Sequence, residues 1–196
     1  MGKAERTRQF IIEQAAPIFN EKGIAGTTIN DIMQATKMAK GGLYGHFESK
    51  DDMSEAIIDH LLGKLATKVS SIVAKEKTAR MKLFALLDFY KDPLEPYCQG
   101  GCPLVNFGVE ADDTNPGIKQ KIGERMLTTQ KYIAGIINQG IADNEFRADF
   151  DAETFGIKMF AMVEGATIIC RVLGDSSQMR TIISNLKTEI NTYRTA

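Results

Sequence analysis

Apolar residues recur every three or four positions along most of the chain, which is the period of an amphipathic α-helix. This periodicity predicts an all-α protein. The expected helices cover residues 4–22, 28–35, 40–46, 49–75, 78–91, 104–111 and 116–144, with an eighth opened by Asp151 and a ninth from about Ser176. The fourth helix is long enough to leave a small N-terminal bundle and enter a second domain.

Residues 27–50 hold two short helical patterns, a tight connection between them, and the start of a third helix. Thr28 with Asp31, and Ser49 with Asp52, have the spacing of a capping box, in which side chain and backbone bond reciprocally at a helix start. On the second short helix, two apolar side chains four positions apart point inward, and cationic, hydroxyl and small residues face outward. Two short helices and a turn of this kind have the form of a helix-turn-helix DNA reader.

The same stretch resembles a known family. Phe19-Asn-Glu-Lys-Gly23, Gly26-Thr-Thr, Asp31-Ile32 and Lys40-Gly-Gly-Leu-Tyr-Gly-His-Phe-Glu-Ser-Lys50 are similar in type and spacing to the tetracycline-repressor (TetR/AcrR) family, over about residues 5–60. The resemblance implies an N-terminal three-helix DNA-binding domain, residues 1–50, and a larger helical ligand-binding and dimerisation domain, residues 51–196. It also implies a ligand-responsive transcriptional repressor that binds double-stranded operator DNA as a homodimer.

The resemblance places the DNA contacts on the two short helices and the start of the next. Lys40 is expected to read a guanine edge, and Lys50 to meet a phosphate at a helix N-terminus. Lys37 and Ala39 depart from the usual turn glycine and capping hydroxyl, each at a cost of about 1 kcal/mol. The implied DNA-binding residues are Thr28, Asn30, Lys40, Gly42, Tyr44, His46 and Lys50.

The eighth expected helix is apolar nearly all round, and the ninth carries a continuous apolar stripe that includes Ile183 and Leu186. One domain of this size could not easily cover so much apolar surface. We therefore expect these two helices to form the dimer interface as a four-helix arrangement, with Ile183 and Leu186 inside it.

Aromatic and methionine side chains of the larger domain could line a pocket between helices, although each is more often plain core. Such a pocket suits a small, mainly apolar inducer. Glu110 and Glu164 lie in apolar stretches and could either orient that ligand or pair with Arg125, Lys158 or Arg171. The candidate ligand-binding residues are Phe107, Glu110, Tyr132, Met159 and Met162.

Cys98 and Cys102 lie in a stretch rich in proline and glycine and offer an alternative function, a thiol- or redox-sensing regulator. The simpler interpretation, which we favour, is that both are small residues that fill a corner between two helices. A metal site is not expected, because His46 and His60 are the only histidines and belong in or near the DNA-binding part. Cys170 is expected in the core.

Composition narrows the class further. The net charge is −1; residues 1–50 carry seven basic and five acidic side chains, or +2, and the remainder carries 17 and 20, or −3. No apolar run approaches ~20 residues, so no membrane span is expected. The N-terminus lacks the apolar core of a signal peptide, and three cysteines are too few for a disulfide framework, which fits a cytoplasmic protein. No catalytic arrangement is recognisable, so neither an enzyme nor a cofactor is expected.

Overall fold

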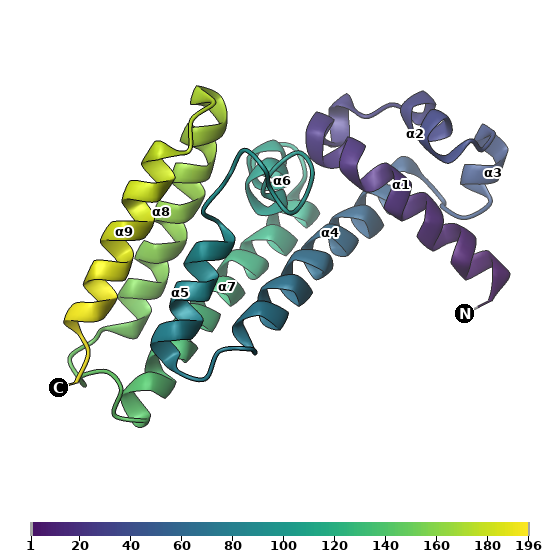
Figure 1. The fold of residues 1–196 in the computed structure, drawn as a ribbon. Coiled ribbons are helices and arrows are strands. Elements are labelled where there is room, and N and C mark those ends of the chain that lie inside the picture. The colour runs from purple at the N-terminus through teal and green to yellow at the C-terminus, as the bar shows by residue number, and fades with distance from the viewer. Residues whose placement is uncertain (1, 196) are drawn as a thin grey trace. The chain divides into compact units, whose positions relative to one another are not determined.

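The computed structural model describes residues 2–195 and confirms the all-helical prediction (Figure 1). The helices are α1 Lys3–Gly26, α2 Ile29–Thr36, α3 Lys40–Tyr44, α4 Lys50–Val73, α5 Ala79–Phe89, α6 Pro103–Ala111, α7 Pro116–Ala142, α8 Ala152–Leu173 and α9 Ser177–Thr192. Phe146 and Arg194 form an isolated antiparallel β-bridge. Over the described part of the chain, no helix is both long and apolar enough to cross a membrane.

The chain forms two compact units, and each gathers segments that are distant in sequence. Unit 1 comprises Met1–Leu65 and Tyr97–Ile122, and unit 2 comprises Ala66–Pro96 and Gly123–Ala196. Unit 1 therefore contains α6 and the first turns of α7 in addition to α1, α2 and α3. The functional boundary expected at residue 50 stays a prediction.

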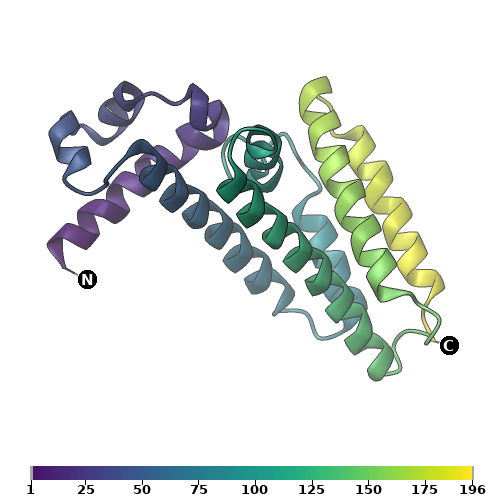
Figure 2. The ribbon, with the colours of Figure 1, turned by 180° about the vertical axis from the view of Figure 1, so that it is seen from behind.

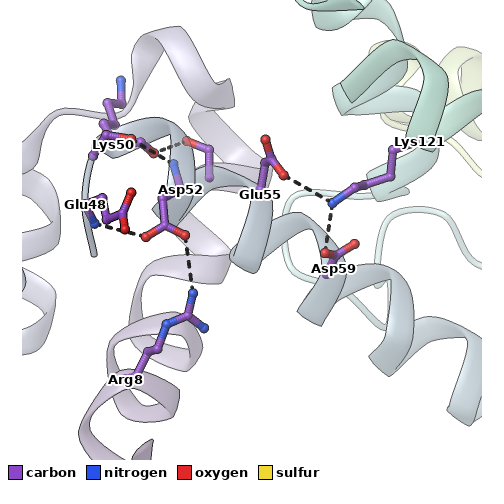
Figure 3. A network of polar contacts seen from close by, with 9 residues as sticks. Arg8, Glu48, Lys50, Asp52, Glu55, Asp59 and Lys121 are labelled. Atoms are coloured by element: carbon purple, nitrogen blue, oxygen red, sulfur yellow. Dashed lines mark hydrogen bonds and ion pairs between the residues drawn. The ribbon is translucent and has the colours of Figure 1, made fainter. Parts of the chain in front are cut away.

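Unit 1 is built around α1, which packs against α2 and α6. Its interior is apolar, with Phe19, Ile32, Leu43 and Phe107 completely buried. Charged side chains hold neighbouring elements together at its surface (Figure 3). Arg8 of α1 lies 3.5 Å from Asp52, and Lys121 of α7 lies 2.8 Å from Asp59 and 3.7 Å from Glu55 of α4. Exposed pairs of this kind each add about 1 kcal/mol or less.

Unit 2 is a helical bundle in which α8 and α9 lie side by side and α5 packs on α9 (Figures 1 and 2). Its core includes Leu83, Ile137, Phe150 and Met159. Ile183 and Leu186 of α9 also belong to this core and are only 6% and 1% exposed. Their expected place in a dimer interface is therefore wrong, because an apolar stripe does not reveal which surface covers it.

The two expected capping boxes differ in the structure. At α2, both reciprocal bonds form between Thr28 and Asp31. At α4, Ser49 Oγ accepts the N–H of Asp52 at 3.1 Å, but the Asp52 carboxylate accepts the N–H of Glu48 at 3.0 Å instead of that of Ser49. The return hydrogen bond of the second box is thus shifted by one residue, from the N–H of Ser49 to that of Glu48. Ser49 still caps the N–H of Asp52 in the first turn of α4.

Candidate nucleic-acid interface

The start of α2 is held by a small polar cluster. Thr28 N–H and Oγ1 both donate to Asp31 Oδ2 at 2.8 Å, and Asp31 N–H donates back to Thr28 Oγ1 at 3.1 Å. Lys22 of α1 donates to Asp31 Oδ1 at 2.7 Å. The Lys22 hydrogen bond, together with those from Thr28, holds the pKa of Asp31 well below its usual range. The first turn of α2 is therefore fixed to α1 by a carboxylate that stays ionised.

The turn between α2 and α3 contains the two departures noted in the sequence. Lys37 adopts a left-handed conformation with φ 57° and ψ 27°, and Ala39 occupies the N-cap of α3 without a side-chain hydrogen bond. Leu43 and Phe47 are buried, as their spacing predicted. These two side chains anchor α3, a short helix whose start is not capped by a side chain.

We call α2, α3 and the turn between them the reader; most of the predicted contact residues lie on its outer side. Thr28, Asn30, Lys40 and Tyr44 are exposed, whereas Gly42 and His46 are half-buried. The Lys40 ammonium lies 5.9 Å from the centre of the Tyr44 ring. A cation, a phenol and amide or hydroxyl groups are thus exposed on α2 and α3, and they are side chains that bond to base edges and phosphates.

Lys50 begins α4 and already has a partner within unit 1. Its Nζ donates to the carbonyl oxygen of Ile24 at 2.6 Å, and the residue is half-buried. An ammonium has three N–H donors, so a phosphate could be bound at the same time. The contact to Ile24 was not foreseen from the sequence.

Glu110 of α6 has a different partner from any of those expected. Its two carboxylate oxygens accept the N–H groups of Ile24 at 2.8 Å and Ala25 at 2.7 Å. Pairing with Arg125, Lys158 or Arg171 is therefore wrong; Lys158 is instead paired with Glu189, and Arg171 donates to the carbonyl of Pro93. The only sequence signal for this contact was a carboxylate on an otherwise apolar helix.

The candidate ligand-binding residues are divided between the units. Phe107 and Glu110 belong to unit 1, and Phe107 is completely buried. Tyr132, Met159 and Met162 belong to unit 2, where Met159 is buried, Met162 is half-buried and Tyr132 is exposed. Their role in ligand binding stays a prediction.

Unit 1 has a pocket of about 480 Å³ between α1, α4 and the segment before α6. Cys98 lies in its wall with 4% of its surface exposed, and burial raises the pKa of this thiol. A buried thiol with a raised pKa is a weak nucleophile, which argues against a thiol switch at Cys98. Burial likewise lowers the pKa of His60, so its imidazole favours the neutral form. The residues that line this pocket are Glu13, Ala16, Pro17, His60, Leu61, Lys64, Tyr97, Cys98 and Gln99.

Comparison with known proteins finds likeness over nearly the whole chain. The family described as "Bacterial regulatory proteins, tetR family" matches residues 11–57, and "Tetracyclin repressor-like, C-terminal domain" matches residues 79–186. A TetR transcriptional regulator from Chloroflexus aurantiacus is 34% identical, with 100% of both chains covered and a TM-score of 0.94. One from Cytophaga hutchinsonii is 35% identical, with 100% of this chain and 98% of the other covered and a TM-score of 0.91. The HTH-type transcriptional repressor KstR2 of Rhodococcus jostii is 29% identical over 152 residues, which are 78% of this chain and 73% of that protein.

Proposed function

Because the chain belongs to the TetR family of bacterial transcriptional regulators, which are not enzymes, we propose that it is a ligand-responsive repressor that is released from operator DNA by a small inducer. The observation that carries this proposal is the reader itself, with Lys40 and Tyr44 exposed on a helix that Leu43 and Phe47 anchor from behind. Such a repressor acts in the cytoplasm, where it meets DNA.

In the proposed complex α3 enters the major groove, where Lys40 donates to guanine O6 and N7. Thr28, Asn30, Tyr44 and His46 contribute further contacts to phosphates and base edges. Lys50 meets a phosphate at the start of α4, where the helix dipole adds to its charge. In a dimer, two copies of α3 lie about 34–36 Å apart, or a multiple of this, and so meet successive turns of one DNA face.

The dimer is proposed to form through α8 and α9. An apolar stripe on one face of α8 is not covered by any of the residues 2–195 that the structure describes, and Val172 and Ile157 on it are 81% and 54% exposed. Exposed apolar patches of this kind mark interaction sites. Apart from the backbone of α8 itself, no described residue lies within 4 Å of the position that a Cβ on Gly165 would take, so a partner helix could approach closely there. The stripe consists of Ile157, Ala161, Gly165, Ile168 and Val172.

The inducer is proposed to be small and mainly apolar. Support comes from the aromatic and methionine side chains that are only partly buried around the core of unit 2, Phe84, Tyr90, Phe160 and Met162. An inducer can release DNA only by its differential affinity for the bound and released states of the protein. Among the predicted ligand residues, Met162 and Tyr132 are accessible in this structure, whereas the buried Met159 and Phe107 would be reached only after a rearrangement.

A binding assay tests the proposal. Duplexes selected from a random library by the protein should bind it as a dimer, with an affinity well above that for unselected duplexes. A thermal-shift screen of aromatic and lipophilic compounds should then find compounds that stabilise the protein and release the selected duplex. Stabilisation by sugars, phosphates or nucleotides, with silence from lipophilic compounds, would contradict the proposed inducer class. Equal affinity for selected and unselected DNA would contradict specific operator binding.

A further inference from the structure

Helix α1 is broken at Gly23, five residues before Thr28, the N-cap of α2. Gly23 has φ 76° and ψ 175°, so the backbone leaves the helical path there and resumes it at once. A ψ near 180° turns the next N–H away from the preceding helical turn. The break therefore interrupts the helical bonds that cross Gly23, among them those in which the N–H groups of Ile24 and Ala25 would donate to the carbonyls of Asn20 and Glu21. Backbone groups that lose such a bond inside a protein need other partners.

Helix α6 supplies partners for both sides of this break. Asn106 Nδ2 donates to the carbonyl oxygen of Asn20 at 2.9 Å. Glu110 accepts the N–H of Ile24 at 2.8 Å and that of Ala25 at 2.7 Å. Asn106 and Glu110 are four positions apart and thus lie on one face of the helix. We call this pair the α6 clamp; it replaces the interrupted helical bonds with one donor and one charged acceptor that takes two N–H groups.

The segment before α6 lies close against the same part of α1. The side chain of Asn20, which is 2% exposed, donates to the carbonyls of Gln99 at 2.6 Å and Gly101 at 3.0 Å. At Gly100, which has φ 93°, a Cβ would lie 2.8 Å from the backbone carbon and oxygen of Asn20. Because this approach requires glycine and a buried amide with defined partners, α6 has one well-specified position on α1.

The clamped residues lead directly into the reader. Ile24 also accepts the Lys50 ammonium through its carbonyl, so two charged side chains hold its two backbone groups. Thr27 is completely buried and donates through Oγ1 to the carbonyl of Gly23 at 2.7 Å, and the next residue is the N-cap of α2. The conformation of residues 23–27 therefore contributes to the placement of α2 and α3 on α1, together with the Lys22–Asp31 contact and the packing of α1 on α2.

We propose that Asn106 and Glu110 are positioning residues for DNA recognition, acting through the backbone of Asn20, Ile24 and Ala25. The proposal rests on the operator binding proposed above and makes α6 a working part of the reader, although α6 lies more than fifty residues beyond it in sequence. When the clamp is lost, residues 23–27 adopt additional conformations. The fraction of molecules with a binding-competent reader falls, and the apparent affinity for DNA falls with it.

The variant Glu110→Gln separates this role from simple electrostatics by the sign of its effect. Removal of a negative charge by itself strengthens binding to a polyanion. A glutamine can accept only one of the two N–H groups, so the proposal expects binding of a library-selected duplex to weaken by about tenfold or more, the equivalent of one charge-assisted hydrogen bond. The salt dependence should not change, because no phosphate contact is removed.

Two control variants carry the same change in charge. Asp113→Asn alters an exposed carboxylate just beyond α6, and Glu145→Gln alters a carboxylate in unit 2 that accepts the N–H groups of Ala79 at 2.7 Å and Arg80 at 2.9 Å. Both controls should leave the affinity within about twofold of the unmodified protein. The proposal is overturned if Glu110→Gln binds as tightly as Asp113→Asn. It is also overturned if Glu145→Gln weakens DNA binding as much, because general destabilisation would then explain both.

Amide hydrogen exchange tests the clamp without any variant. In the unmodified protein and in the absence of DNA, the amides of Ile24 and Ala25 should be protected, and Glu110→Gln should lose this protection while the amides of α8 keep theirs. Fast exchange at both residues in the unmodified protein would refute the clamp even if a variant failed to fold. Failure of the unmodified protein to bind any duplex, with protection intact, would instead refute the proposed function.

Discussion

In each unit, one glutamate accepts two consecutive backbone N–H groups, but the two contacts serve different purposes. Glu145 caps the start of α5 in unit 2, an ordinary helix end whose first N–H groups have no helical partner. Glu110 caps the turn after a break inside α1 of unit 1, close to the start of α2. The same contact thus completes a bundle in one unit and sets the path of the chain into the DNA reader in the other.

The interiors of the two units also differ, in whether polar side chains with specific hydrogen bonds take part in the packing. Unit 2 has a continuous apolar core, and the hydrophobic effect that stabilises it is non-directional. Unit 1 adds a buried amide, Asn20, whose hydrogen bonds specify one arrangement of α1 and α6. We therefore expect substitutions in unit 2 to change folding and association, and substitutions in unit 1 to change DNA recognition. The following predictions begin with the largest effect; the first four test this contrast, and the last measures how far a residue of unit 1 affects stability alone.

Leu186→Glu should unfold unit 2 rather than produce a folded monomer. Leu186 is 1% exposed in the apolar core, so the substitution places a carboxylate where it has no charged partner and removes a packed side chain. We expect a loss of more than about 4 kcal/mol in the free energy of unfolding, measured by urea denaturation. If the variant is instead a folded monomer of near-native stability, Leu186 belongs to the dimer interface and not to the core of unit 2.

Ile168→Glu should give a folded monomer that binds operator DNA about 100-fold more weakly, because two linked readers no longer engage two half-sites. Ile168 is 45% exposed on the α8 stripe. Sedimentation measures the association, and Leu127→Glu is the matched control, since Leu127 is 57% exposed on α7 and outside the stripe. An intact dimer for Ile168→Glu, or a monomer for Leu127→Glu, would place the interface elsewhere.

Lys40→Ala should relax discrimination at one base pair of the operator by about 1–3 kcal/mol, provided that the ammonium bonds guanine O6 and N7. The residue is exposed, and its ammonium lies near the Tyr44 ring on the surface of α3, so stability should not change. Competition between selected duplexes with single base-pair changes measures the effect. An equal loss of affinity on selected and random DNA would remove Lys40 as a base reader.

Lys50→Ala should weaken binding to all duplexes alike and lower the salt dependence by roughly one unit of slope, as expected for one phosphate contact. Lys50→Ala also removes the hydrogen bond to the carbonyl of Ile24, and this should lower the affinity for DNA further without a change in the salt slope. Titrations at several salt concentrations separate the two contributions. If the affinity falls and the slope stays constant, Lys50 acts only by holding Ile24.

His60→Gln should have the smallest effect, confined to the pH dependence of stability. Burial lowers the pKa of His60 in the folded protein below its ordinary value of 6.5, so the unfolded chain binds the proton more readily. The stabilising contribution of the neutral imidazole is complete above pH 6.5 and is lost as the pH falls below it. When the pH is lowered from 7 to 5, the melting temperature of the variant should decrease less than that of the unmodified protein. The difference between the two decreases should be about 2 °C or less. Parallel pH profiles would show that His60 does not contribute.

The helices, the capping box at α2, the left-handed Lys37 and the inward pair Leu43 and Phe47 could all be predicted from the sequence. Each depends on residues a few positions apart, whose relative placement is set by the helical period and by local capping chemistry. The family could be recognised for the same reason, because its motif is a local pattern of this kind.

Only the tertiary structure decided the partners of Glu110, Lys50 and Leu186. Glu110 and Ile24 are 86 residues apart, and Lys50 and Ile24 are 26 apart. A carboxylate on an apolar helix, or an apolar stripe on an amphipathic one, states that a partner is needed without naming it. Whether Leu186 faces its own core or a second subunit, and whether Glu110 faces a ligand or a broken helix, depends on how distant segments pack, because burial and long-range hydrogen bonds exist only once the chain has folded.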